Sequence, residues 1–227
     1  MPPQSLGKIS YEFGPVLWAL FYGAPGALPK PEGEGSNDSE CSHWSSWLSR
    51  TADLYVVDPV IDFALEGNDA DVVVISKVEA KILSRVPARN ENRTFVKCLY
   101  GGGSNEFYNV TLNTVTGKAM VREESLGAAE DPRPYPLPPA AISLSEGGHT
   151  GVRIELDSLG GYFYEGILQA TTSINGEEKV ISIGSQDAPF RWVTPDNQRF
   201  DTIPSFNYVG WDPQARRWVD NYSPWSQ

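Results

Sequence analysis

Two glutamates, Glu155 and Glu165, occupy positions where paired carboxylates could do acid–base chemistry. Residues 152–157 alternate apolar and charged side chains as a strand does, and the Leu-Gly-Gly loop at 159–161 suits a hairpin to the next strand. That loop length sets Glu155 directly opposite Glu165. Like charges across a strand pair are unfavourable unless solvent, a cation or a shared proton separates them. The pair therefore has two interpretations: solvated surface carboxylates near Arg153, or an acid–base or metal-binding pair.

The two histidines of the chain, His43 and His149, extend the list of candidate acids and bases. His149 directly precedes the strand-like residues 152–157, which makes it the third candidate catalytic residue. A Ser/His/Asp arrangement would have to form in space, because no Gly-X-Ser-X-Gly motif is present. A surface or hydrogen-bonded role is the simpler interpretation of both histidines. Cys41 and His43 stand as an isolated pair without zinc-type spacing, so we predict no metal site and no cofactor.

Aromatic rings close to acidic residues form a second group of candidates, because a ring can stack on a sugar while a carboxylate binds its hydroxyl groups. Asp187 and Asp201 lie in loop-like segments near Trp192, and residues 194–227 contain further rings among Pro and Asp. The predicted ligand-binding residues are Trp192, Asp187, Asp201, Trp211, Tyr208 and Trp218. The simpler interpretation makes the acids turn residues and the rings part of the core.

Asn175-Gly176 is the strongest turn signal in the chain, because both residues tolerate the positive φ that a two-residue hairpin turn needs. The predicted pairs are Ile174 with Glu177, Thr171 with Val180, Ala170 with Ile181, Gln169 with Ser182, and Leu168 with Ile183. One face of this pair is apolar and includes Tyr164 and Thr172. Together with residues 152–157, these strands form a predicted three-stranded antiparallel meander.

Shorter strand-like runs fill most of the remaining chain. They cover residues 16–22, 53–65 on either side of a proline, 71–83, 94–100, 106–115, 118–123 and 209–219, and a helical turn is predicted at 44–48. This pattern predicts an all-β protein, either an antiparallel two-sheet β-sandwich (jelly-roll-like) or a β-barrel, with long loops and at most one or two short helices. We expect a single β domain over 1–227. The Pro-rich connector 127–139 is either a point of subdivision or, as we prefer, a crossover between two sheets.

Composition limits the partners of the chain. Its 227 residues carry a net charge of −11 and no basic run, which argues against nucleic acid and disfavours anionic membranes. The apolar run 13–28 is broken by Pro and Gly, so no transmembrane segment is predicted. The oligomeric state is left open.

The compartment is also left open by the sequence. Four Asn-X-Ser/Thr sequons and a disulfide between Cys41 and Cys98 would suit a secreted protein, whereas no clear signal peptide precedes them, which would suit the cytoplasm. The sequons are Asn37, Asn92, Asn109 and Asn221.

Three functions remain compatible with the sequence. The first is a ligand-recognition β-sandwich that binds a glycan or another neutral or cationic small molecule through loop aromatics and acids. The second is a small-molecule isomerase, cyclase or hydrolase that uses a carboxylate or histidine in an apolar pocket. The third is a structural or membrane-active protein whose apolar N-terminal segment and Trp-rich tail form a contact surface. We favour the first, and we leave open whether the chain is an enzyme.

Overall fold

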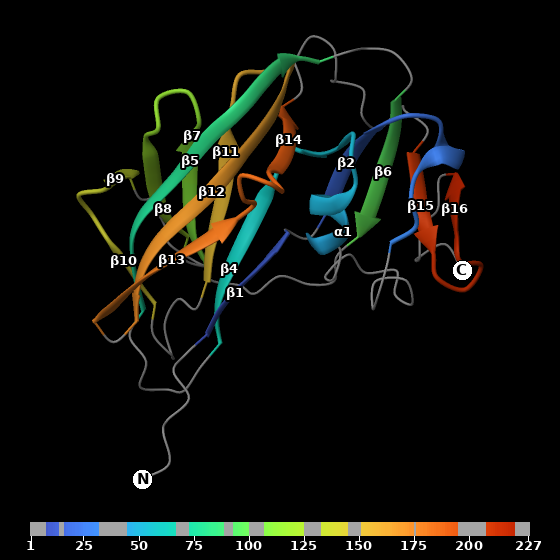
Figure 1. Ribbon diagram of the computed structural model, residues 1–227. Helices are drawn as coiled ribbons and strands as arrows, with labels where there is room; N and C mark the ends of the chain where they lie inside the picture. Colours follow the sequence, from blue (N-terminus) through green and yellow to red (C-terminus); the bar gives the residue numbers. More distant parts are fainter. Residues whose placement is uncertain are drawn as a thin grey trace.

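The chain folds into two β-sheets that pack face to face, with one short α-helix (Figure 1). The computed structural model describes residues 8–13, 16–31, 45–66, 73–88, 93–99, 107–124, 133–144, 151–174, 176–194 and 208–220. The predicted all-β class and the sandwich are confirmed. In the described part of the chain neither sheet closes on itself, so the barrel alternative is wrong.

One sheet has six strands and lies behind the other in the view of Figure 1. In spatial order its strands are β1 (Lys8–Phe13), β4 (Val60–Glu66), β11 (Gly151–Asp157), β7 (Phe107–Asn113), β8 (Ala119–Glu124) and β9 (Tyr135–Leu137). Four of its neighbouring pairs are antiparallel, whereas β11 and β7 run parallel.

The second sheet has ten strands and extends well beyond the first, so that β2, β6, β15 and β16 lie to one side of the two-layer region (Figure 1). Its main path is β10 (Ile142–Leu144), β5 (Val73–Pro87), β12 (Tyr162–Ile174), β14 (Phe190–Thr194), β3 (Leu54–Val57), β2 (Val16–Tyr22), β6 (Arg93–Leu99), β15 (Tyr208–Asp212) and β16 (Arg217–Asp220). The tenth strand, β13 (Glu177–Ile183), pairs with β12. Two further parallel pairs, β14 with β3 and β15 with β6, make this sheet mixed as well, whereas we predicted antiparallel sheets.

The hairpin at Asn175-Gly176 has the predicted register. Ile174 pairs with Glu177, Ala170 with Ile181 and Leu168 with Ile183. Gly176 has a φ of +86°, in agreement with the turn chemistry that identified it. The predicted apolar face is buried along the whole of β12, and on the other face the Gln169 amide donates a hydrogen bond to the Ser182 hydroxyl at 3.2 Å.

The predicted pairing of residues 152–157 with the following strand is wrong. These residues form β11 in the six-stranded sheet, between β4 and β7, whereas the next strand, β12, belongs to the ten-stranded sheet. The Leu-Gly-Gly segment at 159–161 therefore crosses from one sheet to the other and is not a hairpin loop. The amide of Gly161 instead donates a hydrogen bond to the carbonyl oxygen of Thr194, at the end of β14, at a distance of 2.9 Å.

A second crossing between the sheets lies at the end of the Pro-rich connector, after β9, whereas the preceding part of the connector leads from β8 to β9 within one sheet. Strand β9 pairs with β8 in the six-stranded sheet, and after a connection of only four residues β10 pairs with β5 in the other sheet. The two short strands thus join the sheets at one edge. The described part of the connector begins at residue 133.

The main core lies between the two sheets and continues to the short helix α1 (Ser45–Arg50). Trp47 and Leu48 of this helix are buried, as their spacing predicts. A second buried cluster contains Leu20, Phe95 and Val193, and its members alternate along their strands with residues of the main core. The ten-stranded sheet is therefore buried on both faces around β2, β3 and β14. Among the described residues, no helix is long and apolar enough to cross a bilayer.

Candidate functional site

The outward face of the six-stranded sheet carries a continuous set of polar side chains. Strand register places Asp62, Arg153, Asn109 and Arg122 in one row across β4, β11, β7 and β8. The adjoining row across the same strands consists of Val60, Glu155, Thr111 and Met120. Neighbouring strands lie about 4.8 Å apart, so these side chains form a compact surface.

A hollow of about 150 Å³ opens on this face. Its lining residues are Asn109, Thr111, Met120, Arg122, Pro134 and Glu155. An amide, a hydroxyl, a guanidinium and a carboxylate therefore surround a space floored by sheet and bordered by the apolar atoms of Met120 and Pro134. Hydrogen-bonding groups at several edges of a small apolar surface suit a polar ligand that also has nonpolar C–H groups.

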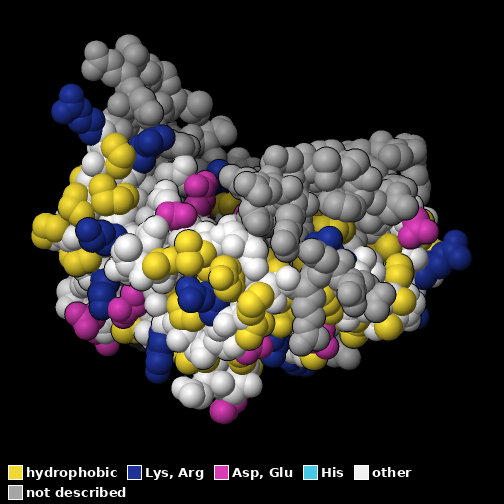
Figure 2. Space-filling view, turned by 90° about the horizontal axis from the view of Figure 1, so that it is seen from above, with side chains coloured by type: hydrophobic (Ala, Val, Ile, Leu, Met, Phe, Trp, Pro, Cys, Tyr) yellow, Lys and Arg dark blue, Asp and Glu magenta, His cyan; other side chains and the backbone are white. Residues whose placement is uncertain are grey.

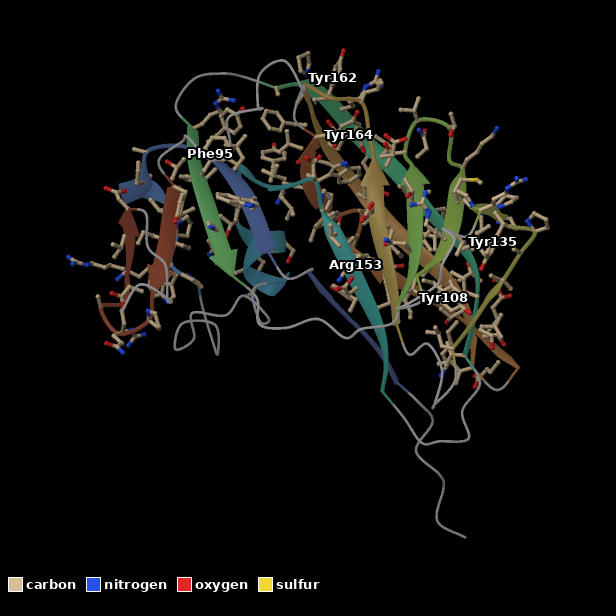
Figure 3. All side chains as sticks on the ribbon, turned by 180° about the vertical axis from the view of Figure 1, so that it is seen from behind. Phe95, Tyr108, Tyr135, Arg153, Tyr162 and Tyr164 are labelled. Atoms are coloured by element: carbon tan, nitrogen blue, oxygen red, sulfur yellow. The ribbon has the colours of Figure 1, made fainter. Side chains whose placement is uncertain are left out.

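A bidentate ion pair between Arg153 and Asp62 flanks the hollow. Arg153 donates from Nε to Oδ1 of Asp62 at 2.9 Å and from its terminal nitrogen Nη2 to Oδ2 at 3.0 Å. Only about a fifth of each side chain is exposed, at 21% and 18%. Arg153 lies on the face of β11 next to β4 (Figure 3). Because both carboxylate oxygens hold it, its position beside the hollow is fixed.

The two predicted catalytic glutamates do not meet. Glu155 lies in the hollow on the six-stranded sheet, whereas Glu165 lies on β12 in the ten-stranded sheet. Glu165 accepts a hydrogen bond from Nε of Arg191 at 3.0 Å, and Nη1 of the same arginine donates to the carbonyl oxygen of Ser49 at 3.2 Å. Glu165 thus helps to hold α1 against β12 and β14, and the paired-carboxylate interpretation is wrong.

Trp192, a predicted ligand-binding residue, lies in the core and is 0% exposed. Its ring stacks on Tyr164 with centroids 5.2 Å apart and planes 8° apart, and its Nε1 donates to the Ser158 hydroxyl at 3.1 Å. The Tyr164 hydroxyl donates to the carbonyl of Leu159, and burial raises the pKa of this phenol. Such a ring stabilises the crossing between sheets and is not open to a ligand.

The C-terminal rings likewise serve the fold. Trp211 is only 2% exposed, and Trp218 lies between it and Trp47 of α1, at centroid distances of 5.3 and 5.7 Å. Trp218 also donates from Nε1 to the carbonyl of Pro29 at 3.1 Å. These contacts explain how an aromatic-rich tail can be buried, and they place its described rings against the body of the protein.

Tyr208 is half-buried, as is Trp218, so both of these predicted rings keep some exposed surface. Tyr208 packs edge-on against Trp18 with centroids 5.6 Å apart, and Nζ of Lys97 lies 5.0 Å from both centroids. Its strand, β15, is four strand spacings, roughly 19 Å, from Trp192 on β14. Those predicted ligand-binding residues that the structure describes therefore do not converge on one site.

Of the remaining predicted residues, Asp187 is described and adds no group to the hollow. Asp187 is exposed in the loop after β13, where the Ser185 amide donates to the Ala188 carbonyl at 2.9 Å, so it occupies a tight turn. His149 and Asp201 lie outside the described residues, as do His43 and Cys41. The side chain of Cys98 is also outside the description, so the disulfide stays a prediction.

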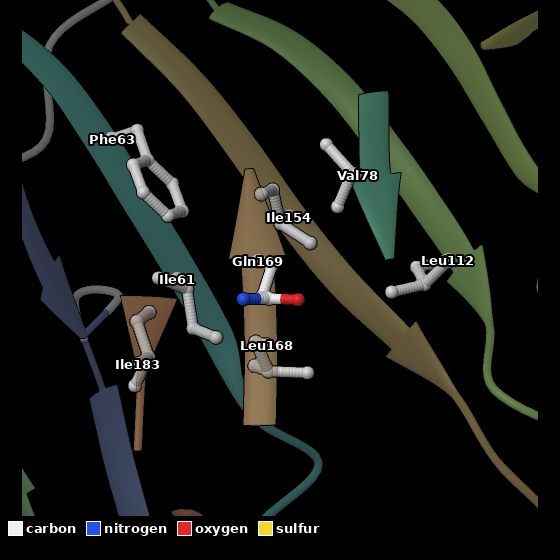
Figure 4. Close-up of a pocket in the computed structure, with 8 residues that line it drawn as sticks. All are labelled: Ile61, Phe63, Val78, Leu112, Ile154, Leu168, Gln169 and Ile183. Carbon is white, nitrogen blue, oxygen red and sulfur yellow. The ribbon is translucent and has the colours of Figure 1, made fainter. Parts of the chain in front are cut away.

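A second cavity lies inside the sandwich and is apolar. Figure 4 shows side chains of both sheets around it, among them Phe63 and Leu112 from one sheet and Leu168 and Ile183 from the other. Its volume of about 10 Å³ has room for no more than about one water molecule. This gap is far smaller than the roughly 300 Å³ that a small-molecule enzyme pocket needs.

Apolar surface on the top of the molecule is broken up by charge. In Figure 2 the hydrophobic side chains of the described residues lie in small groups with charged side chains between them. The apolar N-terminal segment supplies Leu20 and Phe21, which are 0% and 7% exposed. Because Leu20, Phe21 and Trp211 are core residues, these rings and apolar side chains are not part of the contact surface that the membrane-active alternative needs.

Asp58 is a titrating group at the link between β3 and β4, where the chain passes from one sheet to the other. It has a φ of +41°, and its amide donates to the carbonyl of Val193 at 3.0 Å. The residue keeps an exposed edge, but protein atoms crowd its carboxyl group. This burial raises the pKa of Asp58 to about 6, against a smaller lowering by the Thr194 hydroxyl.

We expect Asp58→Asn to stabilise the protein above pH 6 and to have little effect at pH 4. The folded state holds the Asp58 proton more tightly than the unfolded state, so the stability this proton gives is complete below about pH 4 and is lost as the pH rises through 6. Asparagine also tolerates positive φ. Thermal unfolding at pH 4, 5, 6 and 7.5 would measure the effect, with Asp187→Asn as control. An increase in Tm that is the same at every pH would contradict it.

Sequence reasoning missed most of the hollow. Asn109 and Thr111 alternate with buried Val110 and Leu112, and Met120 and Arg122 alternate with buried Val121, so the predicted hairpin already placed these polar residues on one face. The missing information was that β11 lies beside β7 and brings Glu155 to them. In the part of the chain that the structure describes, no three His, Cys, Asp or Glu side chains gather as a metal site would need.

In comparisons with known proteins, no family model, curated protein or solved structure matches the chain.

Proposed function

We propose that the chain is a ligand-recognition protein that binds one ring of a glycan, or a similar polyhydroxylated molecule, in the hollow on the outward face of the six-stranded sheet. The observation that carries the proposal is the hollow itself, where the carboxylate of Glu155, the hydroxyl of Thr111 and the guanidinium of Arg122 come from three neighbouring strands. Sugars present several hydroxyl groups around a ring with apolar faces. The hollow offers hydrogen-bonding groups beside Met120 and Pro134.

Size also favours a single ring. The hollow of about 150 Å³ is smaller than the roughly 300–1,000 Å³ that is typical of sites for drug-sized ligands. A shallow site on a sheet leaves the remaining rings of an oligosaccharide in solvent. The net charge of −11 suits neutral or cationic ligands better than acidic ones.

The enzymatic alternative keeps less support. Its acid–base pair, Glu155 and Glu165, is divided between the two sheets. Glu165 is held by Arg191, and the described apolar cavity is too small for a substrate. A catalytic role for His149 stays a prediction.

We expect Thr111→Tyr to weaken glycan binding strongly, because the larger side chain fills the hollow from its floor on β7. A panel of immobilised neutral and amino-containing oligosaccharides would identify binders of the wild-type protein, and calorimetry would then give affinities. Loss of one or two hydrogen bonds and of the contact surface should weaken binding at least about tenfold.

The matched control for this test is Ser143→Tyr, which adds the same side chain at an exposed strand position of the other sheet. It should bind like the wild type. No binding to any member of the panel, or binding that survives Thr111→Tyr, would contradict the proposed function.

A further inference from the structure

The charged side chains around the hollow differ in whether they have hydrogen-bond or ion-pair partners among the described residues. Arg153, two residues from Glu155 on the same face of β11, gives both of its short hydrogen bonds to Asp62. Arg122, on the far side of the hollow, has other interactions within the chain. Glu155 makes no hydrogen bond or ion pair with any residue that the structure describes. One carboxylate in the hollow is therefore available to a ligand.

Distance keeps Arg122 from taking this role. Register places Arg122 two strands away from Glu155 and one two-residue step along the strand. Strand spacing of about 4.8 Å and a rise of about 3.4 Å per residue put the two backbones roughly 12 Å apart. Glu155 and Arg122 thus line the hollow from two different strands that are not neighbours.

The geometry points to an amino sugar, a pyranose with a free primary ammonium group, as the ligand of the hollow; this inference rests on the proposed function. The ammonium group donates to Glu155, and neighbouring ring hydroxyls bond with Thr111 and Asn109. The C–H groups of the ring pack on Met120. The net charge of −11 attracts a cationic ligand and repels sugars that carry carboxylates.

Other cations fit the hollow less well. A divalent metal ion takes several oxygen ligands, and among the described residues no three metal-ligating side chains meet. A simple alkylammonium ion would use Glu155 and make no hydrogen bond with the hydroxyl of Thr111. An amino sugar uses the carboxylate and the neutral polar groups together.

The test compares three tetrasaccharides that share the same β-1,4-linked ring: the tetramer of glucosamine, its N-acetylated form, and cellotetraose. Calorimetry at constant ionic strength should show the glucosamine tetramer binding about three- to tenfold more tightly than the other two, the range expected for one exposed charge-assisted contact. Glu155→Gln, which keeps the size of the side chain, should remove this preference.

The control is Glu178→Gln, which removes one exposed carboxylate from β13 in the other sheet. It should keep the preference, which separates a contact at Glu155 from general attraction by an acidic protein. Equal affinity for the three tetramers, a preference that survives Glu155→Gln, or an equal loss in Glu178→Gln would overturn the amino-sugar inference. Failure to bind any of the three would also overturn it, whereas the proposed function would be overturned by failure across the whole oligosaccharide panel or by binding that survives Thr111→Tyr.

Discussion

Replacing Trp192 with alanine should lower the free energy of unfolding by about 3–5 kcal/mol, the usual cost of truncating a large buried ring. Trp192 is fully buried, stacks on Tyr164 and Phe190, and donates a hydrogen bond to Ser158. The substitution leaves a cavity beside the crossing from β11 to β12, where backbone from both sheets limits collapse. Urea denaturation followed by far-ultraviolet circular dichroism would measure the loss.

Two further variants make this prediction specific. Trp192→Phe keeps a stacking ring and removes the hydrogen bond to Ser158, so it should cost less than the alanine variant. Val180→Ala, at a side chain that is 55% exposed, should change stability by no more than about 0.5 kcal/mol. A loss below about 1 kcal/mol for Trp192→Ala would mean that the ring is not in the core.

Gly184→Ala should lower the free energy of unfolding by about 2–4 kcal/mol, from backbone strain and overpacking together. Gly184 has a φ of +82°, and an added Cβ would lie 2.5 Å from the backbone nitrogen of Phe190 and 3.0 Å from the carbonyl oxygen of Gly166. Both neighbours are main-chain atoms of paired strands, so neither can move without disturbing the sheet.

Gly176→Ala is the matched control for this clash. Gly176 has a similar φ of +86°, but an added Cβ would meet nothing within 4 Å. Its cost should be limited to the roughly 1–2 kcal/mol of a left-handed alanine. The difference between the two variants isolates the clash, and equal losses in thermal and chemical unfolding would show that Gly184 is not crowded.

The part of the fold that the sequence predicted well is local. The register of β12 and β13 follows from a two-residue turn that prefers Asn-Gly. Once the two turn residues are identified, every residue pair along the two strands is determined. The hairpin of β7 and β8 and the helical turn around Trp47 are local in the same way. Short connections restrict the possible partners of a segment, so pattern alone is enough there.

The sequence pattern of β11 does not determine which of the two sheets the strand joins. Val152, Ile154 and Leu156 give an apolar face that packs equally well from either layer of a sandwich, so alternation cannot say which sheet the strand joins. A Leu-Gly-Gly segment can form either a hairpin loop or a connection from one sheet to the other. The actual neighbours, β4 and β7, are about 90 and 44 residues away in the chain, as the pairs of Arg153 with Asp62 and Asn109 show. Only the assembled core selects them.

The same limit applies to the candidate site. Glu155 was found from its strand, but its predicted partner, Glu165, belongs to the other sheet. Rings such as Trp192 look like ligand-binding residues in a sequence, because composition does not tell a buried ring from an exposed one. Burial is decided by which strands cover them, and that is again a non-local property.

The most direct test of the hollow is an NMR titration of the ¹⁵N-labelled protein with the glucosamine tetramer. Binding in the hollow predicts saturable shift changes at Thr111, Met120, Arg122 and Glu155, on three adjacent strands of the six-stranded sheet, and weak changes elsewhere. Shift changes centred on Trp18 and Tyr208 in the other sheet would contradict the assignment of ligand recognition to this face, and the absence of any shift change would contradict binding of an amino sugar.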